Sequence, residues 1–127
     1  MKTINEIHLK IAKELIKCAQ SNSVISYTEL CERIGSGSPR RMGPKLEQVS
    51  LLTYEMTGKI FLSVLVVLKE TKTSSNPHPG SGFLPMYDRE CKRNNMSDEE
   101  VIRAQRQLAY EQDWSGLIPF MEQHMNL

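Results

Sequence analysis

Arg40, Arg41 and Lys45 are three basic side chains that follow Ser38 and Pro39 in quick succession. Their guanidinium and ammonium groups can bind phosphate oxygens. Proline is common in the first turn of a helix, and the N–H groups that a helix start leaves unpaired attract the same anions. The spacing therefore predicts a phosphate-binding surface at the start of a helix, which is chemistry suited to a nucleic-acid contact.

Residues 24 to 43 must position these side chains, and they have the pattern of a helix-turn-helix. Ser26 and Glu29 form a capping box that starts one helix, and Gly35 ends it. A short glycine- and serine-rich turn then leads to Pro39, which suits a first helical turn. Two helices joined by a tight turn are therefore expected.

Pro44 complicates the start of the second helix. A proline in the interior of a helix that began at Pro39 would cost about 3 kcal/mol. Either the helix starts at residues 43 and 44, or residues 39 to 43 form a separate turn. Both alternatives leave Arg40 and Arg41 at or just before a helix N-terminus.

The helical pattern continues on both sides of this motif. Apolar residues at three- and four-residue steps predict an amphipathic helix over residues 3 to 20 and a further helical stripe over residues 42 to 58. Residues 3 to 58 thus form the helix-turn-helix unit. A capping box that begins at Ser97 starts another helix, and residues 97 to 127 hold this C-terminal helix and a tail.

Residues 59 to 90 are expected to form a β wing. Residues 60 to 68 are nearly all apolar and rich in β-branched side chains, which is typical of a strand covered on both faces. Residues 71 to 82 are a polar loop with several prolines and glycines, and residues 83 to 87 can return as an edge strand. The fold class predicted for the single domain of residues 1 to 127 is α+β, a winged helix-turn-helix of three helices plus a small antiparallel wing, with an additional C-terminal helix.

Composition places the chain among soluble single domains. It has 127 residues, of which 39% are hydrophobic and 24% charged, and its formal net charge is +1. The longest apolar run is too short to cross a bilayer, and the N-terminus carries charge at Lys2, Glu6 and Lys10. We therefore expect a cytoplasmic protein without a membrane segment or a targeting signal. Three cysteines without a close pair argue against a disulfide framework or a structural zinc site.

The stretch from Ser26 to Gly43 resembles the DNA-binding core of the alkylguanine-DNA alkyltransferases and their non-enzymatic alkyltransferase-like relatives. In that family a Ser-Tyr-x-x-Leu-Ala helix precedes a Pro-(Arg/Lys)-x-x-Arg-x-x-Gly helix, and the likeness covers residues 4 to 68. By this resemblance Tyr27 matches the tyrosine that crowds the phosphate beside a flipped nucleotide. Arg40 matches the arginine that fills the space of the flipped base. The residues alone also allow a half-buried aromatic at Tyr27 and a solvated turn at the arginines.

The reactive signature of that family is absent from this chain. The family has Pro-Cys-His-Arg at the start of a strand that ends Val-Val, and the corresponding stretch here is residues 62 to 67. Ser63 stands in place of the thiol, and Val64 in place of the histidine that would activate it. A serine without a base partner is a poor nucleophile, so alkyl transfer is not expected.

Other chemistry finds little support in the spacing. His8, His78 and His124 lie too far apart in sequence to form a metal-ligand motif, so no metal or cofactor is expected. A carboxylate site for metal-assisted nuclease chemistry would need four acidic residues to converge, and their spacing does not show that they do: Glu55, Asp88, Glu90 and Glu111.

Two functions compete. The first is a non-catalytic nucleic-acid-binding protein that binds DNA through the helix-turn-helix, with Tyr27, Arg40, Arg41 and Lys45 as contacts. The alternative is a protein–protein interaction module, such as a small adaptor, inhibitor or regulator, that uses the apolar segment, the wing loop and the acidic C-terminal helix. The charge and the exposed apolar area over the two helices of the motif would distinguish them.

Overall fold

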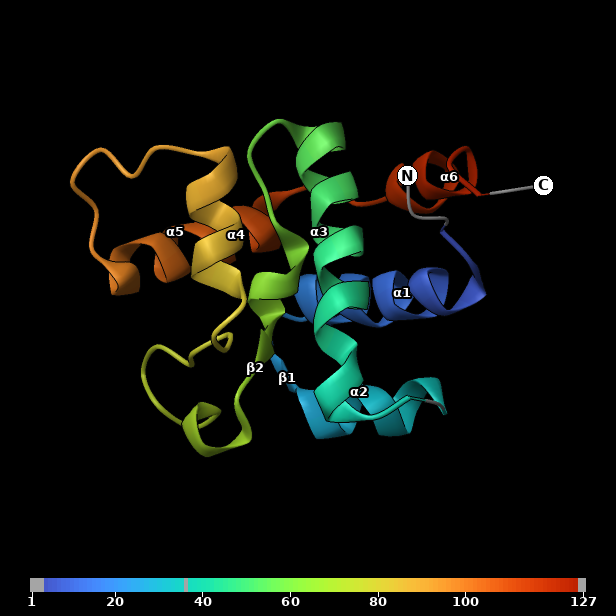
Figure 1. Cartoon of the computed structure of the whole chain (residues 1–127), viewed down its shortest axis with the longest axis horizontal. Coiled ribbons are helices and arrows are strands. Elements are labelled where there is room, and N and C mark those ends of the chain that lie inside the picture. The colour runs from blue at the N-terminus through green and yellow to red at the C-terminus, as the bar shows by residue number, and fades with distance from the viewer. Residues whose placement is uncertain (1–3, 36, 126–127) are drawn as a thin grey trace.

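The computed structural model describes residues 4–35 and 37–125, which fold into a helical domain with one very small sheet (Figure 1). The α-helices and strands in chain order are α1 (Glu6–Gln20), β1 (Ile25–Ser26), α2 (Tyr27–Ile34), α3 (Met42–Thr57), β2 (Val66–Val67), α4 (Phe83–Glu90), α5 (Asp98–Glu111) and α6 (Leu117–Glu122). Three short 3-10 helices complete the order: η1 (Pro39–Arg41), η2 (Leu62–Leu65) and η3 (Lys69–Thr71).

Local sequence signals account for the helix ends. The capping box at Ser26 is present, because its Oγ accepts from the Glu29 N–H at 3.2 Å while the Glu29 carboxylate accepts from the Ser26 N–H. Ser97 caps α5 in the same way. Gly35 ends α2 and Gly58 ends α3, each with a left-handed backbone that suits glycine.

Pro44 lies in the first turn of α3, where its missing N–H breaks no helical hydrogen bond. Residues 39 to 41 form the separate turn η1, and α3 starts at Met42. The structure therefore favours the alternative in which a turn precedes the second helix. Arg40 and Arg41 belong to that turn and stand directly before the N-terminus of α3.

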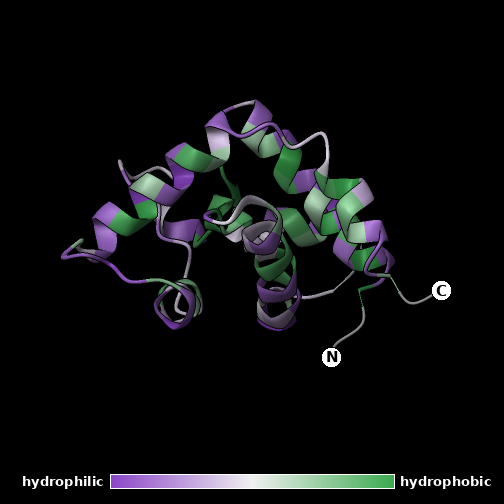
Figure 2. Ribbon diagram, turned by 90° about the horizontal axis from the view of Figure 1, so that it is seen from above, coloured by the Kyte–Doolittle hydropathy of each residue, from purple (hydrophilic) through white to green (hydrophobic). Residues whose placement is uncertain are grey.

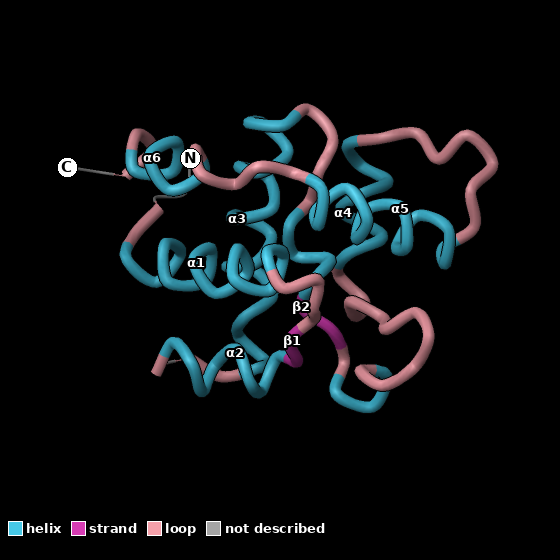
Figure 3. Tube along the Cα trace, turned by 180° about the vertical axis from the view of Figure 1, so that it is seen from behind, coloured by secondary structure: helices cyan, strands magenta, loops and turns pink. Residues whose placement is uncertain are grey.

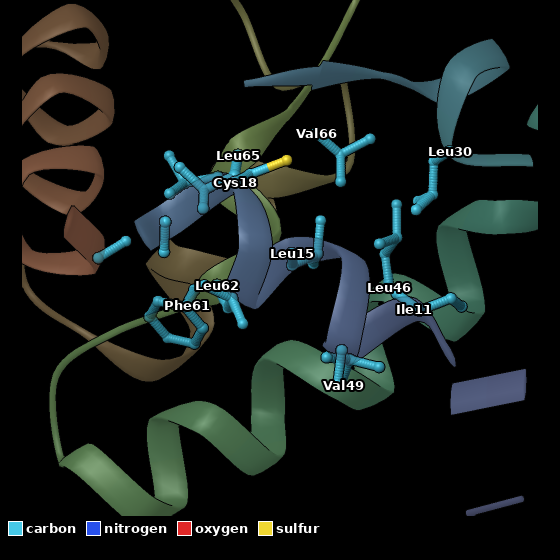
Figure 4. Packing of buried hydrophobic residues seen from close by; sticks show 14 of the residues in the cluster. Ile11, Leu15, Cys18, Leu30, Leu46, Val49, Phe61, Leu62, Leu65 and Val66 are labelled. Carbon is cyan, nitrogen blue, oxygen red and sulfur yellow. The ribbon is translucent and has the colours of Figure 1, made fainter. Parts of the chain in front are cut away.

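The core lies where α1, α3 and α5 meet the segment from Ile60 to Val67. In Figure 1 helix α3 crosses in front of α1, and in Figure 3 it lies behind α1. The helices in Figure 2 carry hydrophilic and hydrophobic residues in bands, as amphipathic helices do. Figure 4 shows apolar side chains from several elements that gather in one cluster, among them Ile11, Leu15, Cys18, Leu30, Leu46, Val49, Phe61, Leu62, Leu65 and Val66.

The predicted antiparallel wing is wrong. Only Val66 and Val67 of the apolar segment are a strand, and they pair in parallel with β1, with Ile25 opposite Val66. Residues 62 to 65 form the 3-10 helix η2 instead of a strand. Apolar content and β-branching had indicated a strand covered on both faces, but the segment is covered by helices.

Side chains of the neighbouring helices replace the missing strand partners. The Phe61 N–H donates to Gln105 Oε1 at 2.8 Å, and the Leu62 N–H donates to Thr53 Oγ1 at 3.1 Å. The Ser63 N–H donates to Ser50 Oγ at 2.8 Å. Buried backbone groups need partners, and these hydroxyl and amide groups allow the segment to remain buried without a sheet ladder.

The expected return strand at residues 83 to 87 is also wrong, because these residues belong to helix α4. Pro85 is the third residue of α4, a position whose N–H has no partner within a helix. Proline therefore fits the helix start as well as it fits a sheet edge. Phe83, Met86 and Tyr87 recur at three- and four-residue steps and are buried by α4.

Candidate nucleic-acid interface

A cleft of about 710 Å³ lies between the N-terminal ends of α2 and α3 on one side and the start of α4 on the other. Tyr27 and Arg40 line it from the helix-turn-helix side, Gly80 and Met86 from the opposite side, and Ser63 from the core. The cleft is therefore formed by segments that are far apart in the sequence. Two of the predicted contacts, Tyr27 and Arg40, thus line the same cleft as Ser63.

Tyr27 closes one side of this cleft. It is the first residue of α2, its side chain is half-buried, and its hydroxyl donates to the Pro79 carbonyl oxygen at 2.6 Å. Burial raises the pKa of the Tyr27 phenol. The sequence left open whether Tyr27 seals its helix or contacts a ligand. In the structure its hydroxyl makes a sealing contact with Pro79, and the side chain also lines the cleft.

The turn at Gly80 packs directly against Tyr27. Gly80 has a φ of +95°, and a Cβ at this position would lie 2.9 Å from the Tyr27 hydroxyl oxygen. His78 holds the turn on its other side, since its carbonyl oxygen accepts from the Leu68 N–H at 2.8 Å and its Nδ1 accepts from the Gly80 N–H at 2.9 Å. The sequence indicated only a polar loop with several prolines and glycines for this wall of the cleft.

The three predicted basic contacts do not lie together. Arg40 is exposed and lines the cleft, whereas Arg41 is exposed and Lys45 half-buried outside its lining. The charge of Lys45 offsets part of the pKa rise that burial causes in the Cys31 thiol. Among the residues that the structure describes, no side chain caps α3 at Arg41. Tyr27 and Arg40 thus share one cleft, while Arg41 and Lys45 flank the start of α3.

The charge within the cleft is balanced. Lys69 and Glu70 from η3 line it, as does Glu47 of α3, whose carboxylate accepts from the Arg89 guanidinium at 2.5 Å. Apolar side chains make up much of the remaining lining, including Leu46, Phe83 and Met86. Such a surface suits an uncharged group better than a phosphate.

Ser63 lies in the cleft wall with a fixed orientation. The residue is 8% exposed, and its Oγ accepts from the Ser50 hydroxyl at 2.6 Å. Ser50 Oγ thus donates to Ser63 Oγ and accepts from the Ser63 N–H. The proton of the Ser63 hydroxyl is not used in this pair and can be donated to another group. Among the described residues, no histidine or carboxylate forms a hydrogen bond with Ser63 Oγ.

The acidic residues considered for a metal site do not converge. Within residues 4–35 and 37–125, no three His, Cys, Asp or Glu side chains form a group that could hold a metal ion. Asp88 pairs with Arg93, and Glu111 accepts from Gln107 on the same helix. Hydrogen bonds and charge from Arg93 lower the pKa of the Asp88 carboxyl.

In the part of the chain that the structure describes, none of the helices has the length and apolar character needed to span a membrane. Comparison of the chain with known protein families, curated proteins and solved structures finds no match.

Proposed function

We propose that this protein binds nucleic acid without catalysis, and that it holds DNA against the N-terminal ends of α2 and α3. The main support is the cleft of about 710 Å³ that opens beside the exposed Arg40 and reaches Ser63. Tyr27, Arg40, Arg41 and Lys45 are the proposed contacts, and the resemblance of residues 26 to 43 to the alkyltransferase-like proteins points the same way.

The distribution of charge indicates different roles for the cleft and for the residues around it. Exposed cations outside the lining, such as Arg41, suit the phosphate backbone because they remain hydrated until they meet it. The lining itself has balanced charge and an apolar part that includes the exposed Leu68, which suits a planar base turned out of the stack. Arg40 lies at the border, where a guanidinium can stack on neighbouring bases.

The proposed role is non-catalytic because, within the described residues, Ser63 has no general base as a hydrogen-bond partner. Attack by a hydroxyl needs a general base within hydrogen-bond reach. The hydrogen bond that fixes Ser63 Oγ comes from the hydroxyl of Ser50, which is not a base at neutral pH. Ser63 can instead donate a hydrogen bond to a group in the cleft.

Fluorescence anisotropy with a labelled duplex tests the proposal. We expect binding that weakens steeply with salt and is strongly weakened in the Arg40→Ala/Arg41→Ala double variant, whose exposed side chains contribute little to folding. Lys59→Ala is a matched control, because Lys59 is exposed beyond the other end of α3. Binding that the double variant retains in full would rule out this interface.

A groove on another part of the surface supports a second candidate, recognition of a protein partner. Apolar atoms of Ile16, Trp114 and Ile118 lie in this groove between α1 and the C-terminal segment. One carboxylate lines it, Glu14, which pairs with two of the four cations in the lining: Lys10, Lys13, Lys17 and Arg33. The charge of the groove remains positive. Charge complementarity favours an acidic amphipathic segment. The apolar stretch from Ile60 to Val67 cannot serve this purpose, because it is buried.

Charge reversal tests this second candidate. The Lys13→Glu/Lys17→Glu double variant should lose affinity for an acidic amphipathic peptide while its duplex binding stays unchanged. Unchanged peptide affinity in that variant would exclude the groove as the docking site.

A further inference from the structure

A second cavity, of about 690 Å³, lies between α5 and two loops, residues 22–24 and residues 72–77. Figure 3 shows the side of the molecule on which α5 and β1 face the loop that follows η3. Four basic side chains line this cavity: Arg33, Lys72, Arg103 and Arg106. None of the described residues in its lining is an aspartate or a glutamate.

Arg106 is the most unusual member of this group because it is buried without an opposite charge. The residue is 8% exposed, and its guanidinium donates to Asn76 Oδ1 at 3.0 Å, the Pro77 carbonyl oxygen at 2.7 Å and the Val64 carbonyl oxygen at 3.2 Å. All three acceptors are neutral. The Arg106 Nε atom is buried and has no partner among the described residues.

This arrangement leaves the charge of Arg106 uncompensated. A buried cation is costly unless an anion offsets it, and burial lowers the pKa of the Arg106 guanidinium. The neutral acceptors fix the position of the guanidinium but do not cancel its field. That field therefore extends into the cavity that Arg106 lines, where an anion would be attracted.

The other three cations differ in how far nearby acids neutralise them. Lys72 pairs with Glu29 at 2.5 Å, and Arg33 lies 3.6 Å from Glu14. Arg103 is exposed and forms no ion pair within the described residues. Arg103 is therefore the cation that can turn toward a ligand at least cost to existing contacts.

We propose that this cavity binds the phosphate group of a small anion, either inorganic phosphate or a phosphomonoester. Several cations around one volume favour a dianion over a single carboxylate. The hydroxyl of Ser75 and the amide of Gln107 add neutral donors to the lining, and Val24 and Pro77 add apolar surface for an organic part. A cavity of this volume has room for more than a bare ion.

The cavity is separate from the cleft beside Arg40. The ends of the 68–82 segment line the cleft, whereas its middle, residues 72 to 77, lines the cavity. Helix α5, which supplies Arg103 and Arg106, lies behind α4 in Figure 1. Binding of phosphate here is therefore independent of the proposed DNA contact, and the two can be tested separately.

Isothermal titration calorimetry at constant ionic strength tests the proposal with inorganic phosphate and with glycerol 3-phosphate as probes, and with glycerol as the uncharged reference. We expect saturable binding of one or both phosphates at a single site and no binding of glycerol. Arg103→Gln should weaken the affinity about tenfold, and Arg103→Lys should restore part of it. Lys59→Gln, an exposed lysine outside the cavity, should leave the affinity unchanged.

Backbone amide shifts in NMR spectra locate the site in the unaltered protein. We expect phosphate to move the resonances of residues 22–24 and 75–76 and to leave those of α3 in place. The proposal is overturned if binding does not saturate, or if Arg103→Gln and Lys59→Gln weaken it equally. Displacement of bound phosphate by a DNA duplex would also overturn it, because the cavity would then belong to a nucleic-acid interface.

Discussion

The contact between Gly80 and Tyr27 shows how one residue type fixes the shape of the cleft. The φ of +95° at Gly80 is unfavourable for any residue with a side chain, and an added methyl group would stand 2.9 Å from the Tyr27 hydroxyl oxygen. Gly80→Ala should therefore lower the free energy of unfolding by about 1 to 3 kcal/mol, measured by urea denaturation.

Two further variants separate backbone strain from the clash. Gly82→Ala should change stability by less than about 1 kcal/mol, because Gly82 has an ordinary φ of −86° and open space around it. Combining Tyr27→Phe with Gly80→Ala removes the oxygen that the methyl group would meet, so the double variant should lose less than the sum of the single losses. Additive losses would show that strain alone acts at Gly80.

The half-buried side chain of Tyr27 makes the stability of the protein depend on pH in the alkaline range. Burial raises the pKa of Tyr27 above its ordinary value, so the folded state keeps this proton more firmly than the unfolded chain does. This contribution is complete below about pH 10 and is lost as the pH rises through the folded pKa. Tyr27→Phe should cost about 1 kcal/mol at neutral pH through the lost bond to Pro79.

The stability difference between the wild type and Tyr27→Phe, measured by urea denaturation, should therefore stay constant up to about pH 9 and shrink as the pH rises above about 10. The other three tyrosines are common to both proteins, so their titration cancels in this difference. A difference that stays constant above about pH 10 as well would contradict the stated effect of burial.

At the scale of elements, the segment from Ile60 to Leu65 depends on side chains of α3 and α5. Gln105 is the clearest case, since its Oε1 accepts from the Phe61 N–H at 2.8 Å and its Nε2 donates to the Lys59 carbonyl oxygen at 2.7 Å. Gln105→Leu removes both bonds and leaves the buried Phe61 amide without a partner. We expect a loss of about 2 to 4 kcal/mol in the free energy of unfolding.

Gln107→Leu is the matched control for this prediction. Gln107 lies on the same helix but is exposed, and its side chain bonds only to Glu111 among the described residues. The substitution should change stability by about 0.5 kcal/mol or less in the same urea experiment. Equal losses in the two variants would mean that helix α5 itself, rather than the bond to the Phe61 amide, determines the result.

The same segment shows where sequence reasoning succeeded and where it could not. Capping boxes and glycine stops are local signals, and α2 and α5 begin where Ser26 and Ser97 predict. The strand predicted for residues 60 to 68 failed because an apolar run indicates burial but not the element that provides it. The partners of its amides, such as Thr53 and Gln105, are polar residues on helices, and no spacing rule reveals them.

The candidate site was predicted only in part, for a related reason. Tyr27 and Arg40 could be named because both belong to one continuous motif. Gly80 and Met86 form the opposite wall but lie more than fifty residues from Tyr27 along the chain, and a return strand was expected where α4 stands. Their approach depends on tertiary contacts, chiefly the bond from Tyr27 to Pro79.

At the scale of the whole molecule, the small net charge of +1 concentrates any nucleic-acid attraction in local groups. If Arg40, Arg41 and Lys45 each neutralise one phosphate, the logarithm of the affinity for duplex DNA should fall with the logarithm of the salt concentration with a slope of about −3. Arg40→Ala/Arg41→Ala should reduce this slope to about −1, while Lys59→Ala leaves it unchanged, measured by anisotropy over a salt series. A slope in the double variant equal to that of the wild type would mean that other cations bind the DNA.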